Sequence, residues 1–257
     1  MKVKVAVLYL DGINRDYETT YAFEKVGAVA EVVHVNSLIN KDVKLKDFQI
    51  VVMPGGFSFG DDIMSAKVWA NKILYRLKDE FQEFVQKDKL VLGICNGFQA
   101  LVRIGLLPFN KIGNIDAALI HNDSGKFESR WVKLKIEESN CVFTKGMEGK
   151  VIEVPVSHGE GKFIADEKVL DKIEDENKVV FRYVDKRGRA TQEYPENCNG
   201  ALRAIAGICD ESGKIMGLMP HPECYVNETQ HPNWTFLSKG KEPDALPIFQ
   251  NAVNYFK

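Results

Sequence analysis

A cysteine stands at a predicted turn between a strand and a helix, and this turn constrains the fold more than any other feature of the sequence. Cys95 lies in the pentad 93–97, Gly-Ile-Cys-Asn-Gly, which follows the apolar run 89–92 and precedes the helix-like stretch 98–102. Glycines two positions either side of Cys95 allow a tight turn without Cβ clashes and lift the side chain above the sheet edge. The start of a helix also favours a thiolate. The pattern indicates a nucleophile elbow, and the alternative is a buried structural cysteine.

Apolar runs and helical periodicity alternate along the first 106 residues. Strand-like runs are found at 3–9, 30–35, 48–53 and 89–94, and helix-like segments at about 17–27, 63–87 and 96–106. This alternation predicts an α/β fold, with an open and mostly parallel sheet that carries helices on both faces. Cys95 then lies at the carboxyl end of a strand, which is the edge where open α/β sheets bind ligands.

The second half of the chain has a different pattern. Strand-like runs separated by turns occur at 128–136, 150–156, 179–185, 202–209 and 215–219. Such a series predicts mostly antiparallel strands added to the sheet. The charged stretch 166–178 is interpreted as a solvated helix or loop, and residues 247–256 have the apolar spacing of a closing helix packed on the domain.

A cysteine nucleophile needs a base, and one of the five histidines has suitable surroundings. His221 lies in Pro-His-Pro-Glu at 220–223, where an apolar strand ends. The prolines fix the local backbone, and Glu223, two positions further along an extended chain, can lie on the same side as the imidazole. Cys95, His221 and Glu223 are therefore the candidate nucleophile, base and base-orienting carboxylate. Taken alone, Pro-His-Pro-Glu would be interpreted as a surface turn.

A glycine-rich loop follows the predicted strand 48–53. Residues 54–62 are Pro-Gly-Gly-Phe-Ser-Phe-Gly-Asp-Asp. Glycines directly after a strand allow backbone N–H groups to approach a ligand, as an oxyanion hole requires. We expect donors from Gly55, Gly56 or Phe57, and a second donor from Asn96, the residue after the nucleophile. Phosphate binding is the alternative for such a loop, but neither the P-loop pattern nor a good dinucleotide-binding pattern is present.

Composition and charge narrow the class of protein. The 257 residues suffice for one large domain, and 34 basic against 36 acidic side chains leave no electrostatic footprint for nucleic acid. Five cysteines form no Cys-x-x-Cys pair and no disulfide framework, which indicates a reducing compartment. No apolar run approaches membrane-spanning length, and the first residues are interpreted as a strand rather than a signal peptide. We expect a cytoplasmic enzyme with no membrane or nucleic-acid partner.

Several motifs, in order along the chain, resemble those of a known family. The segments 93–99 (Gly-Ile-Cys-Asn-Gly-Phe-Gln), 54–61 and 220–223 are similar to the motifs of class I, or triad, glutamine amidotransferases. The similarity is closer still to the glutaminase subunits of phosphoribosylformylglycinamidine synthase, an enzyme of purine biosynthesis. The motifs that carry this closer similarity are at 105–108 (Gly-Leu-Leu-Pro), 122–132, 155–163 (with Ser-His-Gly-Glu-Gly) and 197–200.

The resemblance implies a single glutamine amidotransferase domain over 1–257, of flavodoxin-like fold, with a C-terminal extension at about 224–257 packed on it. It implies that the triad hydrolyses glutamine and that ammonia passes to a synthetase subunit. That subunit would use ATP and Mg²⁺ to convert formylglycinamide ribonucleotide to the amidine, and a small bridging subunit is a further expected partner. No cofactor is then expected in this chain.

The same resemblance points to further site residues. Gln99, Arg130, His158 and Glu160 are expected to line the glutamine pocket or the partner interface. Gln99 has an equally simple alternative as an exposed polar residue of a helix. His158 with Glu160 also suggests a metal site, but no third ligand stands at a suitable spacing, and no metal is expected.

Other functions are compatible with an elbow and a histidine. One is a stand-alone cysteine hydrolase or peptidase of the same fold, and another is a glutaminase subunit that serves a different synthetase. A third is a binding module that has kept the fold without activity. The Pro-His-Pro-Glu motif and the extended Gly-Gly-Phe-Ser loop argue against the first, and the intact triad argues against the third.

Overall fold

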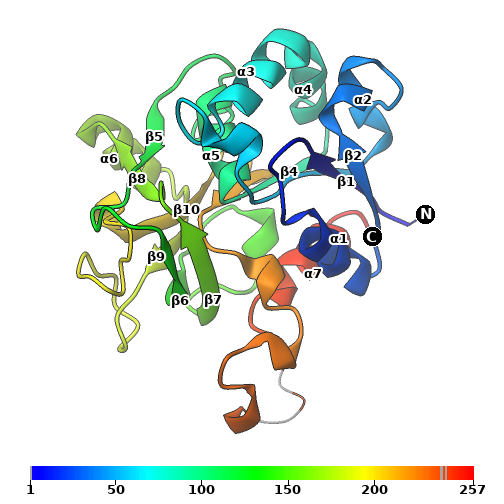
Figure 1. The fold of residues 1–257 in the computed structure, drawn as a ribbon. Coiled ribbons are helices and arrows are strands. Elements are labelled where there is room, and N and C mark those ends of the chain that lie inside the picture. Colours follow the sequence, from blue (N-terminus) through cyan, green and yellow to red (C-terminus); the bar gives the residue numbers. More distant parts are fainter. Residues whose placement is uncertain (1, 238–239, 241) are drawn as a thin grey trace.

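The structure is a computed structural model that describes residues 2–237, 240 and 242–257, and its centre is one large sheet (Figure 1). The strands of this sheet are β1 (Lys4–Tyr9), β2 (Val29–His34), β3 (Ile50–Met53), β4 (Leu90–Ile94), β6 (Glu128–Ile136), β7 (Val151–His158), β9 (Val179–Tyr183), β10 (Ile205–Cys209) and β11 (Ile215–Leu218). Within the described residues, these nine strands have the order β2-β1-β3-β4-β11-β10-β9-β6-β7. Two further strands, β5 (Ala117–Ile120) and β8 (Lys162–Ala165), form a separate antiparallel pair.

One half of the large sheet is parallel and buried. Neighbouring strands run parallel from β2 through β1, β3 and β4 to β11. β3 and β4 are buried along their whole length. A strand covered on both faces needs a nearly continuous apolar run, which Ile-Val-Val-Met in β3 and Leu-Val-Leu-Gly-Ile in β4 provide. The other half, from β11 through β10, β9 and β6 to β7, is antiparallel. The predicted combination of a parallel sheet with added antiparallel strands is therefore confirmed.

Helices cover both faces of the parallel half. The helices of the described residues are α1 (Asp16–Lys25), α2 (Val35–Ile39), α3 (Lys67–Arg76), α4 (Lys78–Val85), α5 (Asn96–Ile104), α6 (Glu167–Asp175), which lies near β8 outside the parallel half, and α7 (Leu246–Asn254). In Figure 1, α1 and α7 lie together on one side of the sheet, and α3, α4 and α5 lie on the other. None of the helices in the described ranges exceeds ten residues, so none has the length to cross a membrane.

The segment after His221 leads to α7, which closes the first face of the sheet. Phe249 of α7 packs edge-on against Phe23 of α1, with ring centroids 5.1 Å apart. Asn251 donates hydrogen bonds to the carbonyl oxygens of Phe143 and Lys145, 3.1 and 2.9 Å away. In the extension 224–257, residues 238, 239 and 241 lie outside the described part of the chain. The helix predicted over 247–256 is present, beginning one residue earlier and ending at Asn254.

The single helix predicted over 63–87 is wrong. Residues 63–66 form a loop, and α3 ends at Arg76, one residue before Leu77, where the backbone leaves the helical region with φ −133° and ψ 10°. The apolar spacing runs through this break, because Trp69, Ile73, Leu77 and Phe81 are all buried in the same core. The periodicity of apolar residues cannot reveal this helix break, because Leu77, where the break lies, is itself buried at the expected spacing.

Three smaller differences concern the second half of the chain. The run 202–209 is a strand only from Ile205, because Arg203 has a left-handed φ of 51° inside a short 3-10 turn. β11 was predicted among the antiparallel strands, but it pairs parallel to β4 and extends the parallel half. β5 and β8, four residues each, are absent from the predicted strands, since runs this short give little periodic signal.

Candidate active site

The turn between β4 and α5 has the geometry of a nucleophile elbow. Cys95 has φ 50° and ψ −106°, a conformation rarely adopted by a residue other than glycine. A Cβ on Gly97 would lie 1.7 Å from the carbonyl oxygen of Met53, and one on Gly93 would lie 2.5 Å from Leu101. Both glycines are therefore required for α5 to pack closely on β3 and β4. The Cys95 amide donates to the carbonyl of Leu218 in β11, 2.8 Å away, which anchors the turn to the sheet.

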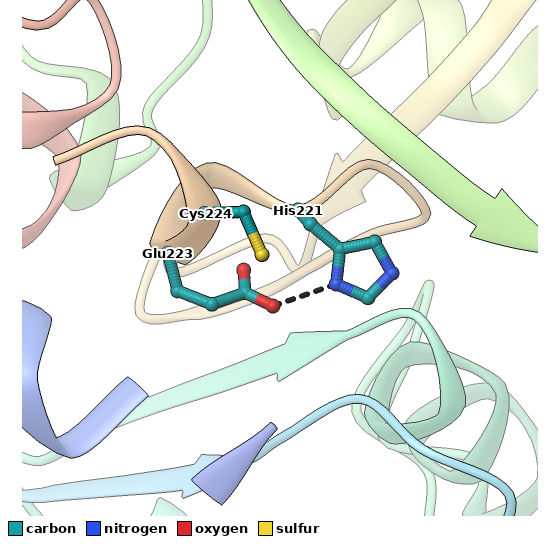
Figure 2. A group of neighbouring side chains, drawn as sticks. All are labelled: His221, Glu223 and Cys224. Atoms are coloured by element: carbon teal, nitrogen blue, oxygen red, sulfur yellow. Dashed lines mark hydrogen bonds and ion pairs between the residues drawn. The ribbon is translucent and has the colours of Figure 1, made fainter. Parts of the chain in front are cut away.

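His221 and Glu223 form a buried pair beside the elbow. His221 follows β11, and Glu223 belongs to the short 3-10 turn Pro222–Cys224. The Nδ1 atom of His221 lies 2.6 Å from Oε1 of Glu223, and Figure 2 shows the carboxylate facing this edge of the imidazole. Both side chains are buried. A carboxylate on Nδ1 fixes the ring so that the other nitrogen, Nε2, is free to exchange a proton.

The electrostatics of the pair favour the charged imidazole. Burial opposes the imidazolium and is the largest single influence, but the Glu223 carboxylate, and after it Cys95, outweigh burial and raise the pKa of His221 above its usual range. Nε2 of His221 is buried and has no hydrogen-bond partner among the described residues. Sγ of Cys95 lies 3.7 Å from the carbonyl oxygen of Ser157 in β7. Cys95 lies close enough to His221 to raise the pKa of its imidazole, which places the nucleophile beside the base.

Three of the four predicted backbone donors are available for an oxyanion in the described chain. The Phe57 amide donates to the carbonyl of Gly12, 2.8 Å away, so this predicted donor is wrong. The amides of Gly55, Gly56 and Asn96 make no hydrogen bond within the described residues. Gly55 serves the site through its lack of a side chain, because a Cβ there would lie 2.7 Å from Cε1 of His221. The predicted donors that remain free are therefore the N–H groups of Gly55, Gly56 and Asn96.

Gln99 and Glu160 meet behind the elbow. Gln99 is buried, so its alternative interpretation as an exposed helix residue is wrong. Its side chain donates from Nε2 to the carbonyl oxygen of Glu160, 2.6 Å away, and accepts from Nδ2 of Asn96 at 3.0 Å. The elbow helix is thereby joined to the turn that follows β7. The ring of Phe57 faces the ring of Phe127 above this region, with centroids 6.0 Å apart.

His158, at the end of β7, is a second buried histidine near the triad. Burial, and after it the neighbouring His221, lower the pKa of His158 to about 3, so its imidazole is neutral. Nε2 of His158 lies 3.0 Å from Nδ2 of Asn199, which also donates to the hydroxyl of Tyr183 at 2.9 Å. A Cβ on Gly161 would overlap the His158 ring. The motifs at 157–161 and 197–200 are thus parts of one packed unit.

Arg130 is not brought to the triad. Its guanidinium lies 2.5 Å from the buried carboxylate of Glu128, donates to the Tyr194 hydroxyl at 2.7 Å and stacks over the Tyr194 ring. Among the described residues, no contact joins Arg130 to Cys95, His221 or Glu223. Its position suits an adjacent surface, next to a hollow lined by Asp123, Lys126, Tyr194 and Cys198.

Sequence reasoning missed Arg15, Cys224 and Asp61. Arg15 N–H donates to the carbonyl of Gly55, 3.2 Å away, and the charge of Arg15 is close enough to Glu223 and Cys224 for all three to influence each other. Burial and then Glu223 raise the pKa of Cys224 above its usual range. Asp61 accepts a hydrogen bond from the side chain of Asn96. The signal for Asp61 and Arg15 was their place in loops that follow parallel strands at the same sheet edge.

Ligand atoms of His221, Glu223 and Cys224 lie within 4.8 Å of one another (Figure 2). The separation of 2.6 Å between Nδ1 and Oε1 is that of a shared proton, and Arg15 adds a positive charge beside them. We therefore assign His221 and Glu223 to the triad rather than to a metal centre.

Known proteins are similar to this chain in sequence and in fold. Residues 2–256 match the family model of the CobB/CobQ-like glutamine amidotransferase domain. The chain is 45% identical to phosphoribosylformylglycinamidine synthase subunit PurQ of Dehalococcoides mccartyi, covering 99% of this chain and 98% of the relative. It is 44% identical to the PurQ subunit of Methanococcus maripaludis strain C7, covering 98% and 97%.

A solved structure agrees with these matches. The chain superposes on a chain in the structure of PurLQS from Thermotoga maritima with a TM-score of 0.76, at 33% identity and over the full length of both chains. The elbow, the buried His-Glu pair and the free N–H groups are therefore found on a fold that this group shares. The chain belongs to the CobB/CobQ-like glutamine amidotransferase family, and within it to the PurQ subunits of phosphoribosylformylglycinamidine synthase.

Proposed function

We propose that this chain is the glutaminase subunit of phosphoribosylformylglycinamidine synthase, which hydrolyses glutamine and delivers ammonia to a synthetase subunit. The observation that carries the proposal is the His221–Glu223 pair, buried with a hydrogen bond of 2.6 Å beside a cysteine at a strand-to-helix elbow. The identity of the synthase is inferred from the names of the relatives, and the PurLQS structure supports assembly with other subunits.

The first half of the reaction is formation of a thioester. The raised pKa of His221 favours transfer of the thiol proton from Cys95 to Nε2, giving a thiolate and an imidazolium that Glu223 stabilises. The sulfur attacks the side-chain amide carbon of glutamine, and the amide oxygen takes the negative charge. The N–H groups of Asn96 and of Gly55 or Gly56 bind this oxyanion.

The second half releases both products. His221 returns its proton to the amide nitrogen as the C–N bond breaks, so ammonia leaves and Cys95 holds a γ-glutamyl thioester. The neutral imidazole then accepts a proton from a water molecule that attacks the thioester carbon. Glutamate departs, and the proton on His221 restores the original ion pair with Cys95. Every proton therefore passes through Nε2 of His221, which has no hydrogen-bond partner in the described part of the chain.

Entry of glutamine requires a local opening of the site. Cys95 is only 5% exposed, and the loop 54–62 covers the same sheet edge. Loops of this kind move on binding of substrate or partner. Ammonia must also be kept from solvent on its way to the synthetase subunit, so the partner is expected to dock over this edge. A small bridging subunit is part of the same proposal.

The synthetase step needs ATP and Mg²⁺, and we propose that both bind the partner subunit. The glycine-rich loop of this chain, residues 54–62, does not contain the Gly-Lys-Ser/Thr sequence that ends a phosphate-binding P-loop. Its backbone conformation is also tied to Gly12 and to the elbow rather than open for a phosphate. We likewise propose a cytoplasmic location, because five unpaired cysteines fit a reducing compartment.

The test uses Cys95→Ala in the complex reconstituted with the synthetase subunit. Loss of the nucleophile removes the covalent route, so glutamine-dependent formation of the amidine is expected to fall to background. Ammonium chloride added in place of glutamine is expected to support the reaction at the wild-type rate, because the partner's chemistry is intact. Glutamine-dependent turnover by the Cys95→Ala complex would refute the function.

A further inference from the structure

The side chain of Asn96 is held by three hydrogen bonds. Its Oδ1 accepts from the amide of Ser58 at 3.2 Å, and its Nδ2 donates to Oδ1 of Asp61 at 2.9 Å and to Oε1 of Gln99 at 3.0 Å. Asn96 is fully buried, and its own backbone N–H is one of the proposed oxyanion donors. The residue that stabilises the oxyanion is thus clamped from outside its helix by the loop 58–66.

This loop adopts a backbone that its own sequence does not favour. Phe59, Asp61, Ile63 and Ala66 all have left-handed φ angles, between 53° and 71°. Such angles are unfavourable for residues other than glycine and persist only where other contacts enforce them. Ile63 and Met64 are exposed, so burial of these apolar side chains does not hold the loop. The loop is held instead by its hydrogen bonds and by the packing of Phe59 and Ala66 on the core.

Asp61 is the residue through which the polar contacts of the loop pass. Its Oδ1 accepts from Nδ2 of Asn96 and also from the amide of Ala66, 3.3 Å away, so one atom joins the elbow to the far end of the loop. A second set of bonds fixes Ser65, whose amide donates to Glu160 and whose carbonyl accepts from Nε of Arg103 at 2.7 Å. Asp61 Oδ1 is thus one of two acceptors, with Oε1 of Gln99, that hold Nδ2 of Asn96, and it is the one that belongs to the loop.

The charges around Asp61 support this assignment. The carboxylate is half-buried, and burial, together with the nearby Glu160 carboxylate, raises the pKa of Asp61, while its hydrogen bonds oppose the rise. Arg103 is the basic group that lies close to both carboxylates. A carboxylate at this half-buried position, beside a second carboxylate, costs desolvation energy that a neutral residue would avoid. We therefore infer that the charge or the hydrogen bonds of Asp61 have a function.

We propose that Asp61 is a positioning residue for glutamine hydrolysis, which sets the orientation of Asn96 and so aims its backbone N–H at the oxyanion. The proposal rests on the glutaminase function given above and extends it to a residue outside the triad. Asp61 acts through Asn96 and touches neither Cys95 nor His221. Because the oxyanion forms only after the thiolate attacks, correct aim of this N–H matters more in the transition state than for substrate binding.

The expected signature is therefore a loss in kcat with little change in KM. Complete removal of an oxyanion donor costs about 10²–10³-fold in kcat, and a misaimed donor retains part of its effect. For Asp61→Ala we expect a kcat for glutamine hydrolysis at least about 10-fold lower, with KM within about three-fold of wild type. Asp61→Asn keeps an oxygen that can accept from Asn96, so it is expected to recover most of the lost kcat.

The experiment measures glutamate release by the full complex carrying each variant, over a range of glutamine concentrations. The matched control is Asp62→Ala, which removes the adjacent carboxylate, exposed and without a hydrogen bond in the described chain. It is expected to behave as wild type. Ammonia-dependent synthesis is measured in parallel and is expected to be unchanged in every variant.

A double-mutant cycle with Asn96→Ala separates positioning from a structural effect. Asn96→Ala removes the same hydrogen bond between Asn96 and Asp61 but leaves the bond of Asp61 to the Ala66 amide. This variant therefore tests the proposal even if Asp61→Ala does not fold. If the hydrogen bond between Asn96 and Asp61 is what positions the donor, the kcat of the double variant is no lower than that of the poorer single variant. Additive losses, an unchanged kcat in Asn96→Ala, or an Asn variant as poor as the Ala variant at position 61 would each overturn the proposal. Failure of the wild-type complex to hydrolyse glutamine would instead refute the proposed function.

Discussion

Glu223→Gln is the substitution that most directly tests the electrostatics of the triad. Glutamine has nearly the size of glutamate and can still accept a hydrogen bond from Nδ1 of His221, so the ring keeps its place. The change removes only the negative charge that lies 2.6 Å from Nδ1. We therefore expect the fold to persist and the protonation of His221 to change.

The structure itself provides a reference for the size of this effect. His158 is as deeply buried as His221 but has no carboxylate partner, and burial with the charge of His221 lowers its pKa to about 3. Without the charge of Glu223, burial dominates at His221 too, and its pKa is expected to fall well below 7. Each pKa unit corresponds to about 1.4 kcal/mol, or about tenfold in the population of the imidazolium. A fall of two to four units below neutral pH predicts a loss in kcat of about 10²–10⁴-fold.

The assay is steady-state glutamine hydrolysis by the reconstituted complex, with alkylation of Cys95 by iodoacetamide as a second readout. Alkylation at neutral pH is expected to slow, because the thiolate loses its cationic partner. Glu153→Gln is the matched control, since Glu153 lies 3.3 Å from Nε2 of His231 in a second His-Glu pair, with a partly exposed carboxylate. A kcat for Glu223→Gln within about tenfold of wild type would show that the charge of Glu223 is not what activates the site.

Three further predictions follow from the same geometry. Gly55→Ala is expected to lower kcat at least about tenfold, because its Cβ would lie 2.7 Å from Cε1 of His221 and must displace the ring; full activity would mean that the loop yields instead. A glutamine analogue with a diazo-ketone group is expected to label Cys95 faster than the other four cysteines, of which Cys198, Cys209 and Cys224 have raised pKa values; even labelling in peptide maps would contradict this. His158→Gln is expected to remove about 1.4 kcal/mol per pH unit from the slope of unfolding free energy between pH 4.5 and 6, and parallel denaturation curves for both proteins would show that His158 protonates freely.

Much of the fold and the triad could be predicted because both depend on local patterns. The buried strands β3 and β4 are uninterrupted apolar runs, and the elbow follows from the two glycines at 93 and 97 on either side of Cys95. His221 and Glu223 are two residues apart, so their contact is encoded within one short segment. Features of this kind need no knowledge of distant residues.

The rest depends on long-range contacts that a pattern does not contain. Gln99 is buried because the carbonyl of Glu160, 61 residues away, accepts from its amide. The Phe57 amide is unavailable because Gly12, in a loop after another strand, accepts from it. The break at Leu77 leaves the apolar spacing intact, and the role proposed for Asp61 depends on a left-handed backbone that its sequence does not favour.

The protonation states of the two buried histidines could not be predicted either, and they have opposite consequences for stability. His221 has a raised pKa in the folded state, so its contribution is fully present below the unfolded value of about 6.5 and is lost as the pH rises through the folded pKa. His158 has a lowered pKa, so its contribution is present above about 6.5 and is lost as the pH falls toward 3. The two contributions are jointly greatest near pH 6.5. A positive charge on one of these two imidazoles disfavours a positive charge on the other. Because Glu223 stabilises the charged form of His221, the proton is held by His221, which is the histidine beside Cys95.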